Sequence, residues 1–130
     1  MYDKPVAPRL NSEEAQLLAK GVAEFNSGRF FECHDTLEEL WMGTRGPARD
    51  FFQGLIQIAV GFYHINHRNL TGGESQLDKG LKKLAAYGDA YAGIELALLR
   101  SQIQSWLDKI RRHEALECAV ADLPKYRFTP

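Results

Sequence analysis

Hydrophobic and polar residues follow the 3.6-residue period of amphipathic α-helices in five segments of this chain. Short stretches rich in glycine, proline or asparagine separate these segments, and no stretch alternates with the period of two that marks a strand. Short connections favour antiparallel neighbours, so the pattern predicts an all-α fold, a compact antiparallel bundle of about five helices. The expected helices cover residues 12–25, about 29–42 and about 48–67, followed by one that contains residues 77–87 and one that contains residues 99–110.

The expected helix starts carry recognisable capping residues. Asn11 followed by Glu14 predicts a capping box at the first helix, and Thr71 followed by Glu74 predicts a second one at the fourth. Pro47 suits the first turn of the third helix, where its missing N–H costs nothing.

Length and composition indicate one ordinary globular domain over residues 1–130. Residues 1–10 show no period and are expected to form an irregular lead-in. Residues 114–130 are expected to be a mostly irregular tail that lies back on the bundle through Tyr126 and Phe128. A formal net charge of −1 gives no reason to expect nucleic acid as a partner, and no apolar run is long enough to span a membrane.

The N-terminal residues and the cysteines point to the cytoplasm. The first ten residues, MYDKPVAPRL, lack the basic start and apolar core of a signal peptide. Cys33 and Cys118 form no metal-binding or redox spacing. Cys33 falls among aromatic residues and is expected to be a small buried apolar side chain.

One polar cluster lies in residues 30–41, FFECHDTLEELW. At about 100° per residue, His34 and Glu38 share a face with Phe31 and Trp41, whereas Thr36 falls on the opposite side. A buried carboxylate needs a partner, and His34 lies one turn from Glu38. The pattern therefore predicts a buried His34–Glu38 pair and a solvated Thr36.

The third expected helix is apolar on nearly every side except for one stripe, which contains Gln53, Gln57 and His64. A helix that is apolar almost all round is usually central in its fold. An antiparallel hairpin of the second and third helices would set His34 opposite Gln57 and Glu38 opposite Gln53. The sequence thus predicts a polar ladder across this interface, with His64 about 10 Å farther along the axis than Gln57.

Two glycines, Gly54 and Gly61, flank the same stripe. Because glycine has no Cβ, another backbone can approach the third helix closely at these positions.

The segments FNSGRFFECHDTLEELW and GPARDFFQGLIQIAVGFYHINHRNLTGG, within residues 25–73, resemble the small helical proteins classed as domain of unknown function 309. The shared features are an FFExHExLExxW pattern, a QGLIQ segment with a histidine about two turns on, and a GNxxGA-like turn. Asp35 replaces the usual glutamate, and Gly73 stands where alanine is common. The resemblance implies an all-helical bundle and no established activity. The matching positions are Phe31, Glu32, His34, Leu37, Glu38, Trp41, Gln53, Gly54, Gln57, His64, Asn69 and Gly72.

Two functional interpretations of the polar residues remain open. In the favoured one, a network of His34, Glu38, Gln53, Gln57 and His64 fixes helix register in a protein with a structural or interaction role. In the alternative, the chain is a small metal-dependent or acid–base enzyme, hydrolase-like, in which His34, Glu38 and His64 are catalytic groups or ligands of a divalent metal. A solvent-accessible cleft at His34 favours the enzyme, and a sealed ladder favours structure.

A third hypothesis concerns the start of the third helix. Arg45 and Arg49 lie near its free backbone N–H groups, a setting that attracts phosphate or carboxylate. The favoured interpretation is local, with the arginines solvated or paired with Glu38 or Glu39. The sequence specifies neither a reaction, a substrate nor a partner, and it leaves homo-oligomerisation open.

Overall fold

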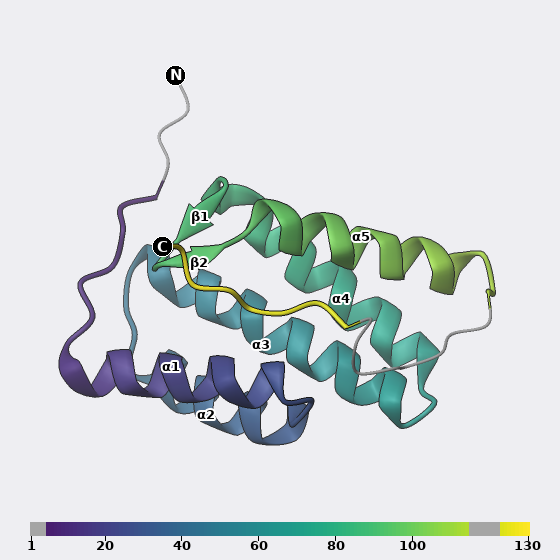
Figure 1. Ribbon diagram of the computed structural model, residues 1–130, viewed down its shortest axis with the longest axis horizontal. Coiled ribbons are helices and arrows are strands. Elements are labelled where there is room, and N and C mark those ends of the chain that lie inside the picture. The colour runs from purple at the N-terminus through teal and green to yellow at the C-terminus, as the bar shows by residue number, and fades with distance from the viewer. Residues whose placement is uncertain (1–4, 115–122) are drawn as a thin grey trace.

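A computed structural model describes residues 5–114 and 123–130 of the chain (Figure 1). In these residues five α-helices pack together beside one small hairpin, so the predicted all-α bundle is confirmed. The elements are α1 (Ser12–Asn26), α2 (Phe30–Met42), α3 (Pro47–Asn66), α4 (Leu70–Leu84), the 3₁₀ turn η1 (Ala85–Tyr87), β1 (Ala90–Tyr91), β2 (Ile94–Glu95) and α5 (Ala97–Arg111).

Helix α3 is the central element of the fold, as its nearly all-round apolar surface predicts. It lies between the α1–α2 pair on one side and the α4–α5 pair on the other (Figure 1). Its side chains are therefore buried in several directions, and Phe51, Phe52, Leu55, Ile58 and Phe62 are all inaccessible to solvent. None of the helices in the described ranges is long and apolar enough to cross a membrane.

The capping box predicted at the start of the first helix is confirmed, and the one predicted at the start of the fourth helix is wrong. The Asn11 side chain accepts a hydrogen bond from the Glu14 backbone N–H, and the Glu14 carboxylate accepts one from the Asn11 N–H. Helix α4 instead begins at Leu70, and its cap is Asn69, whose side chain accepts from the Gly72 N–H. The Thr71–Glu74 pattern misleads because Thr71 lies inside the first turn.

Helices α3 and α4 approach each other so closely that their backbones meet at glycines. A Cβ on Gly80 of α4 would lie 2.9 Å from the Gly54 carbonyl oxygen of α3, and one on Gly73 would lie 3.2 Å from the Gly61 oxygen. The close approach predicted at Gly54 and Gly61 is therefore confirmed, and α4 is the helix that makes it.

A hairpin that the hydrophobic pattern misses joins α4 to α5. Strands β1 and β2 pair antiparallel across Ala92 and Gly93, whose φ angles of 52° and 76° are both positive. Two successive positive φ values are typical of a type I′ turn, which matches the twist of paired strands. Each strand contains only two residues, which is too short for an alternating pattern to register.

The C-terminal residues return to the bundle through Tyr126, as predicted. The Tyr126 ring stacks on Phe25 with 3.7 Å between centroids, and its hydroxyl donates to the Leu55 carbonyl oxygen at 2.7 Å. The Asn26 side chain bonds both the N–H and the C=O of Tyr126. Residues 123–130 contain no helix, whereas residues 115–122 of the expected irregular tail, including Cys118, lie outside the described residues.

Phe128 contributes less to this contact than predicted. Its backbone forms a bridge with Ile94, beside the hairpin, but its side chain is 51% exposed. A single antiparallel bridge thus fixes the backbone of Phe128 and leaves its ring at the surface beside Gly93.

We expect Gly80→Ala to destabilise the fold, because its Cβ would meet Ile58 Cγ1 at 2.7 Å and the Gly54 oxygen at 2.9 Å. Alanine favours a helix by about 1 kcal/mol over glycine, but overpacking costs about 1–3 kcal/mol. Urea denaturation should therefore show a net loss of about 1–2 kcal/mol.

Gly43→Ala is the matched control, because its Cβ would meet no atom closer than 3.9 Å. Its free energy of unfolding should stay within about 0.5 kcal/mol of the parent protein. Equal effects of the two substitutions would contradict a backbone contact at Gly80.

Candidate functional site

An open pocket between α2 and α3 brings together two of the predicted site residues, His34 and His64. It has a volume of about 150 Å³ and is lined by Phe30, Phe31, His34, Val60, Tyr63 and His64. Antiparallel packing sets the start of α2 against the end of α3, which places the two histidines at one pocket although no hydrogen bond joins them in the described residues. The two histidines therefore border the same pocket despite the expected axial offset of His64.

His34 and Glu38 form a pair within α2, but the pair is not buried as predicted. His34 Nε2 lies 2.9 Å from Glu38 Oε2, and His34 Nδ1 lies 3.3 Å from Asp35 Oδ1. The side chains of His34 and Glu38 are 30% and 45% exposed. Each nitrogen of the imidazole thus faces a carboxylate, and the ring is held at the edge of the pocket where solvent reaches it.

The burial of His34 and Glu38 is overestimated because α2 packs through a different stripe. Its buried apolar residues are Phe30, Cys33, Leu37 and Leu40. The two other assignments from the helical projection fail for the same reason. Phe31 is 50% exposed rather than inside, and Thr36 is 6% exposed rather than solvated.

The predicted ladder with Gln53 and Gln57 is not formed. Both glutamines are half-buried on α3, yet no hydrogen bond joins either of them to His34 or Glu38 in the described part of the chain. Gln57 Oε1 is buried without a partner. Since Glu38 already accepts from His34 within the same helix, the pair has no need of a partner across the interface.

His64 is held by the turn that starts α4. The Asn69 side-chain Nδ2 lies 3.5 Å from His64 Nδ1, and the Asn69 backbone N–H donates to the His64 carbonyl oxygen at 2.8 Å. The neighbouring Tyr63 ring contacts Phe31 at 5.9 Å and His67 at 4.1 Å between centroids. Phe31, Tyr63 and His67 therefore form a row of contacting rings beside the pocket.

The residues proposed as metal ligands do not converge. Among the described residues, no three histidine, cysteine, aspartate or glutamate side chains are grouped closely enough to hold a metal ion. Glu38 is turned toward His34, and His64 is turned toward Asn69. The ligand set of His34, Glu38 and His64 is therefore not assembled.

Arg49 has a structural contact that the sequence does not predict. Its Nη1 donates to the Trp41 carbonyl oxygen at 3.0 Å and to the Thr44 oxygen at 3.1 Å, and its guanidinium carbon lies 3.9 Å from the centre of the Trp41 ring. It thus satisfies carbonyls at the end of α2. No ion pair joins Arg49 to Glu38 or Glu39 in the described ranges.

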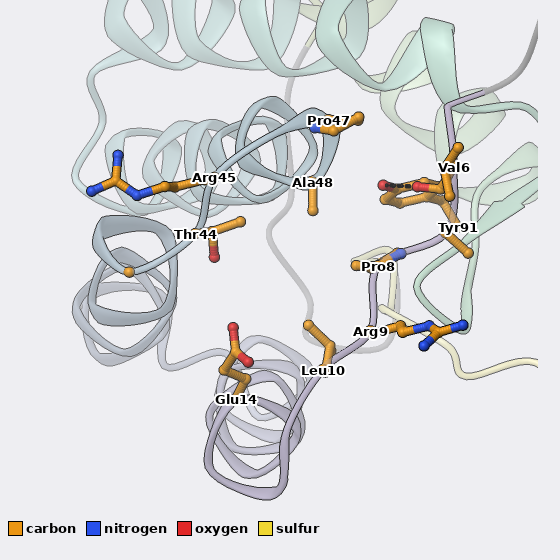
Figure 2. A pocket seen from close by; sticks show the side chains of 12 residues that line it. Val6, Pro8, Arg9, Leu10, Glu14, Thr44, Arg45, Pro47, Ala48 and Tyr91 are labelled. Carbon is orange, nitrogen blue, oxygen red and sulfur yellow. Dashed lines mark hydrogen bonds between the residues drawn. The ribbon is translucent and has the colours of Figure 1, made fainter.

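Arg45 is exposed and does not converge with Arg49 on an anion. A second pocket of about 230 Å³ lies beside it, between the N-terminal segment and the loop that starts α3 (Figure 2). Figure 2 shows the Arg45 guanidinium pointing away from this pocket. The Thr44 hydroxyl donates to the Leu40 oxygen and the Glu14 carboxylate accepts from the Asn11 N–H, so these polar groups already have partners.

Cys33 is fully buried, as predicted, and is chemically protected. Burial raises the pKa of its thiol to about 12, and the nearby negative charge of Glu24 adds to the increase. A thiol with such a pKa remains protonated at neutral pH and is a poor nucleophile. Cys33 therefore belongs to the core and not to the site.

Two residues of the site lack a role in the sequence-based predictions. Tyr63 precedes His64 and lines the pocket beside it. Asn69 appears only as a matching position of the family resemblance, although the run HINHRN places it close to two histidines. An asparagine just after a helix end is a signal for the next cap, and that signal could have identified it.

The match to a known family covers this site. Residues 18–75 match the sequence model of a domain of unknown function (DUF309), which confirms the family resemblance for that segment. All six residues that line the pocket, together with Asn69 and Gly72, fall inside it. No activity is established for this family.

Two relatives are similar beyond the matched segment. An uncharacterized protein of Aquifex aeolicus (strain VF5) is 28% identical over 97 residues, which cover 74% of this chain and 29% of that protein. The uncharacterized protein YpuF of Bacillus subtilis (strain 168) is 29% identical over 103 residues, which cover 76% of this chain and 59% of that protein. The chain thus spans less than two thirds of the length of either relative.

We expect Arg49→Ala to lower the free energy of unfolding by about 2 kcal/mol, because it removes two charge-assisted hydrogen bonds and a cation–π contact. Thermal and urea denaturation measure the loss. Arg45→Ala removes the same charge from an exposed position of the same loop and should change stability by less than about 0.5 kcal/mol. Equal losses in the two variants would show that Arg49 acts only through its charge.

Proposed function

We propose that this chain is a binding protein for a small, mainly apolar molecule, and that the pocket between α2 and α3 is its site. The observation that carries the proposal is an open, aromatic-lined pocket with two histidines at its rim. Apolar clefts with a few convergent polar groups are the usual form of small-molecule sites. The location of the whole lining within residues 18–75 supports the same assignment.

The size and lining of the pocket limit the ligand. A volume of about 150 Å³ suits one ring or a short branched chain, since apolar cavities of about this size take up benzene. Phe30, Phe31, Val60 and Tyr63 offer apolar and aromatic surface. We therefore propose a ligand with a single-ring apolar body and one polar group that reaches the histidines.

The His34–Glu38 pair fits a ligand-binding role better than a purely structural role in the core. Glu38 holds His34 at 2.9 Å, and both side chains are partly exposed. A purely structural network would be expected to be closed to solvent and fully paired. Under this proposal Glu38 holds the His34 ring as part of the pocket edge.

The proposal also includes a cytoplasmic location and no role for nucleic acid. The free, buried Cys33 thiol suits a reducing compartment, and the net charge of −1 offers no general attraction to phosphate. No metal is part of the proposal.

We expect Val60→Phe to abolish binding without unfolding the protein, because the half-buried Val60 lines the pocket and a larger side chain would fill it. Acetophenone is a suitable single-ring probe, with an expected dissociation constant on the order of millimolar. Titration followed by two-dimensional NMR should shift the signals of Phe31 and Tyr63 in the parent protein but not in Val60→Phe.

Leu98→Phe is the matched control, because Leu98 is 47% exposed on α5 and the substitution adds an aromatic ring away from the pocket. It should bind acetophenone as the parent protein does. Undiminished binding by Val60→Phe would show that acetophenone does not bind in this pocket. Absence of binding by the parent protein would refute the proposed ligand class.

A second candidate function, acid–base catalysis, uses the same pocket. It is favoured by the His34–Glu38 contact of 2.9 Å, because a carboxylate that orients an imidazole is a common arrangement for a general base. The pocket lining contains no serine, threonine or cysteine that could act as a nucleophile. Proton transfer on the ligand itself is therefore the chemistry that would fit.

If His34 is a general base, the protein should accelerate exchange of the acetophenone methyl protons for deuterium in D₂O. With Nε2 held by Glu38, the longer contact of Nδ1 with Asp35, 3.3 Å, would have to open so that Nδ1 could remove a proton from the carbon next to the carbonyl. The resulting enolate would take a deuteron from solvent. His34→Ala should slow the catalysed exchange roughly 10²-fold, and Glu38→Gln should slow it less. The signal loss is followed by ¹H NMR.

His113→Asn removes an exposed imidazole far along the chain and keeps a residue that tolerates the positive φ of 56° at this position. The exchange rate should be unchanged in this variant. Binding without accelerated exchange would leave the binding role intact and eliminate catalysis.

A further inference from the structure

The start of α4 determines which atom of His64 is free for a ligand. The Asn69 side-chain Oδ1 accepts from the Gly72 N–H at 2.9 Å as the helix cap. The amide orientation is therefore set, because an exchange of its oxygen and nitrogen would place two donors against each other. The Nδ2 of Asn69 is left facing His64 Nδ1 at 3.5 Å.

This contact selects one form of the His64 ring. An amide nitrogen can only donate, so a hydrogen bond in this contact requires His64 Nδ1 to accept, without a proton of its own. A neutral imidazole with an unprotonated Nδ1 carries its proton on Nε2. In the form that this contact favours, His64 has its N–H at Nε2, and this nitrogen has no hydrogen-bond partner among the described residues.

Gly72 makes the arrangement sterically feasible. A Cβ at this position would lie 2.6 Å from Asn69 Nδ2 and 3.1 Å from His64 Cδ2. Any side chain at position 72 would therefore push the amide and the imidazole out of their present positions. The cap, the glycine and the ring form one unit at the rim of the pocket.

The other histidine cannot supply the same donor. His34 Nε2 is 2.9 Å from Glu38 Oε2, and His34 Nδ1 is 3.3 Å from Asp35 Oδ1. Both of its nitrogens face carboxylates within α2. Of the two histidines that line the pocket, His64 is therefore the one with a nitrogen that no described residue contacts.

We infer that Asn69 is a positioning residue that fixes His64 as a hydrogen-bond donor at Nε2, and that the pocket selects ligands with an acceptor oxygen such as a carbonyl. The inference rests on the proposed binding function for the ligand class, but the state of His64 is independent of any ligand. A carbonyl that accepts from His64 would also be polarised for proton loss at the adjacent carbon, which is the chemistry considered for His34.

The first measurement is the state of His64 in the ligand-free protein, read from long-range ¹H–¹⁵N correlations of the histidine rings, with His64→Ala identifying its signals. The parent protein should show a proton on Nε2 and none on Nδ1. Asn69→Asp keeps the cap oxygen for Gly72 but offers an acceptor to Nδ1, so a proton should appear on Nδ1. Asn66→Asp adds the same charge at an exposed neighbouring position of α3 and should leave His64 as in the parent protein.

The second measurement compares acetophenone with α-methylstyrene, which has the same shape but a methylene group in place of the carbonyl oxygen. The parent protein and Asn66→Asp should bind acetophenone roughly fivefold more tightly, as one hydrogen bond implies. His64→Ala and Asn69→Asp should lose this preference.

The outcomes distinguish the role of Asn69 from the selectivity of the pocket. A mixture of ring forms in the parent protein, or an unchanged His64 in Asn69→Asp, would overturn the role of Asn69. Equal binding of the two probes by the parent protein would overturn the acceptor selectivity alone. Failure of both probes to bind would overturn the proposed function and the ligand class together, while the ring measurement would still decide the role of Asn69.

Discussion

The backbone contact between α3 and α4 is the constraint on which the other parts of the structure depend. Gly54 and Gly61 of α3 meet Gly80 and Gly73 of α4, and a Cβ added at Gly80 would lie only 2.9 Å from the Gly54 carbonyl oxygen. Side chains at these positions would separate the helices and open the core around Leu77 and Leu84, which are fully buried there. Because α4 lies so close to α3, its first turn reaches the side chain of His64.

The site arises from the way the helix ends meet around this contact. Antiparallel packing sets the start of α2 beside the end of α3, and the sharp turn into α4 passes through Arg68, whose φ is 60°. Phe31 and His34 come from the first element, Tyr63 and His64 from the second, and Asn69 from the third. Helix ends are suitable places for such sites, because their unsatisfied backbone groups already require polar side chains nearby.

The two halves of the chain contribute differently to the molecule. Residues 18–75, which match the family, contain the whole pocket and the cap that holds His64. The later residues cover other parts of the core, where Trp106 packs edge-on against Phe62 of α3 and Tyr126 stacks on Phe25 of α1. This covering allows α3 to be apolar on nearly all sides while its C-terminal end stays open at the pocket.

The sequence by itself determined the number and approximate limits of the helices, the central position of α3, the close approach at Gly54 and Gly61, and the pairing of His34 with Glu38. Each of these depends on local periodicity or on spacing within one helix, which the order of residues contains directly. The tertiary structure alone decided the rotation of α2 about its axis, which exposes Phe31 and His34 and buries Thr36. It also decided that Arg49 binds carbonyls and that Asn69 holds His64. These features depend on how neighbouring helices share their apolar surface, and a helical projection of one segment contains no information about its neighbours.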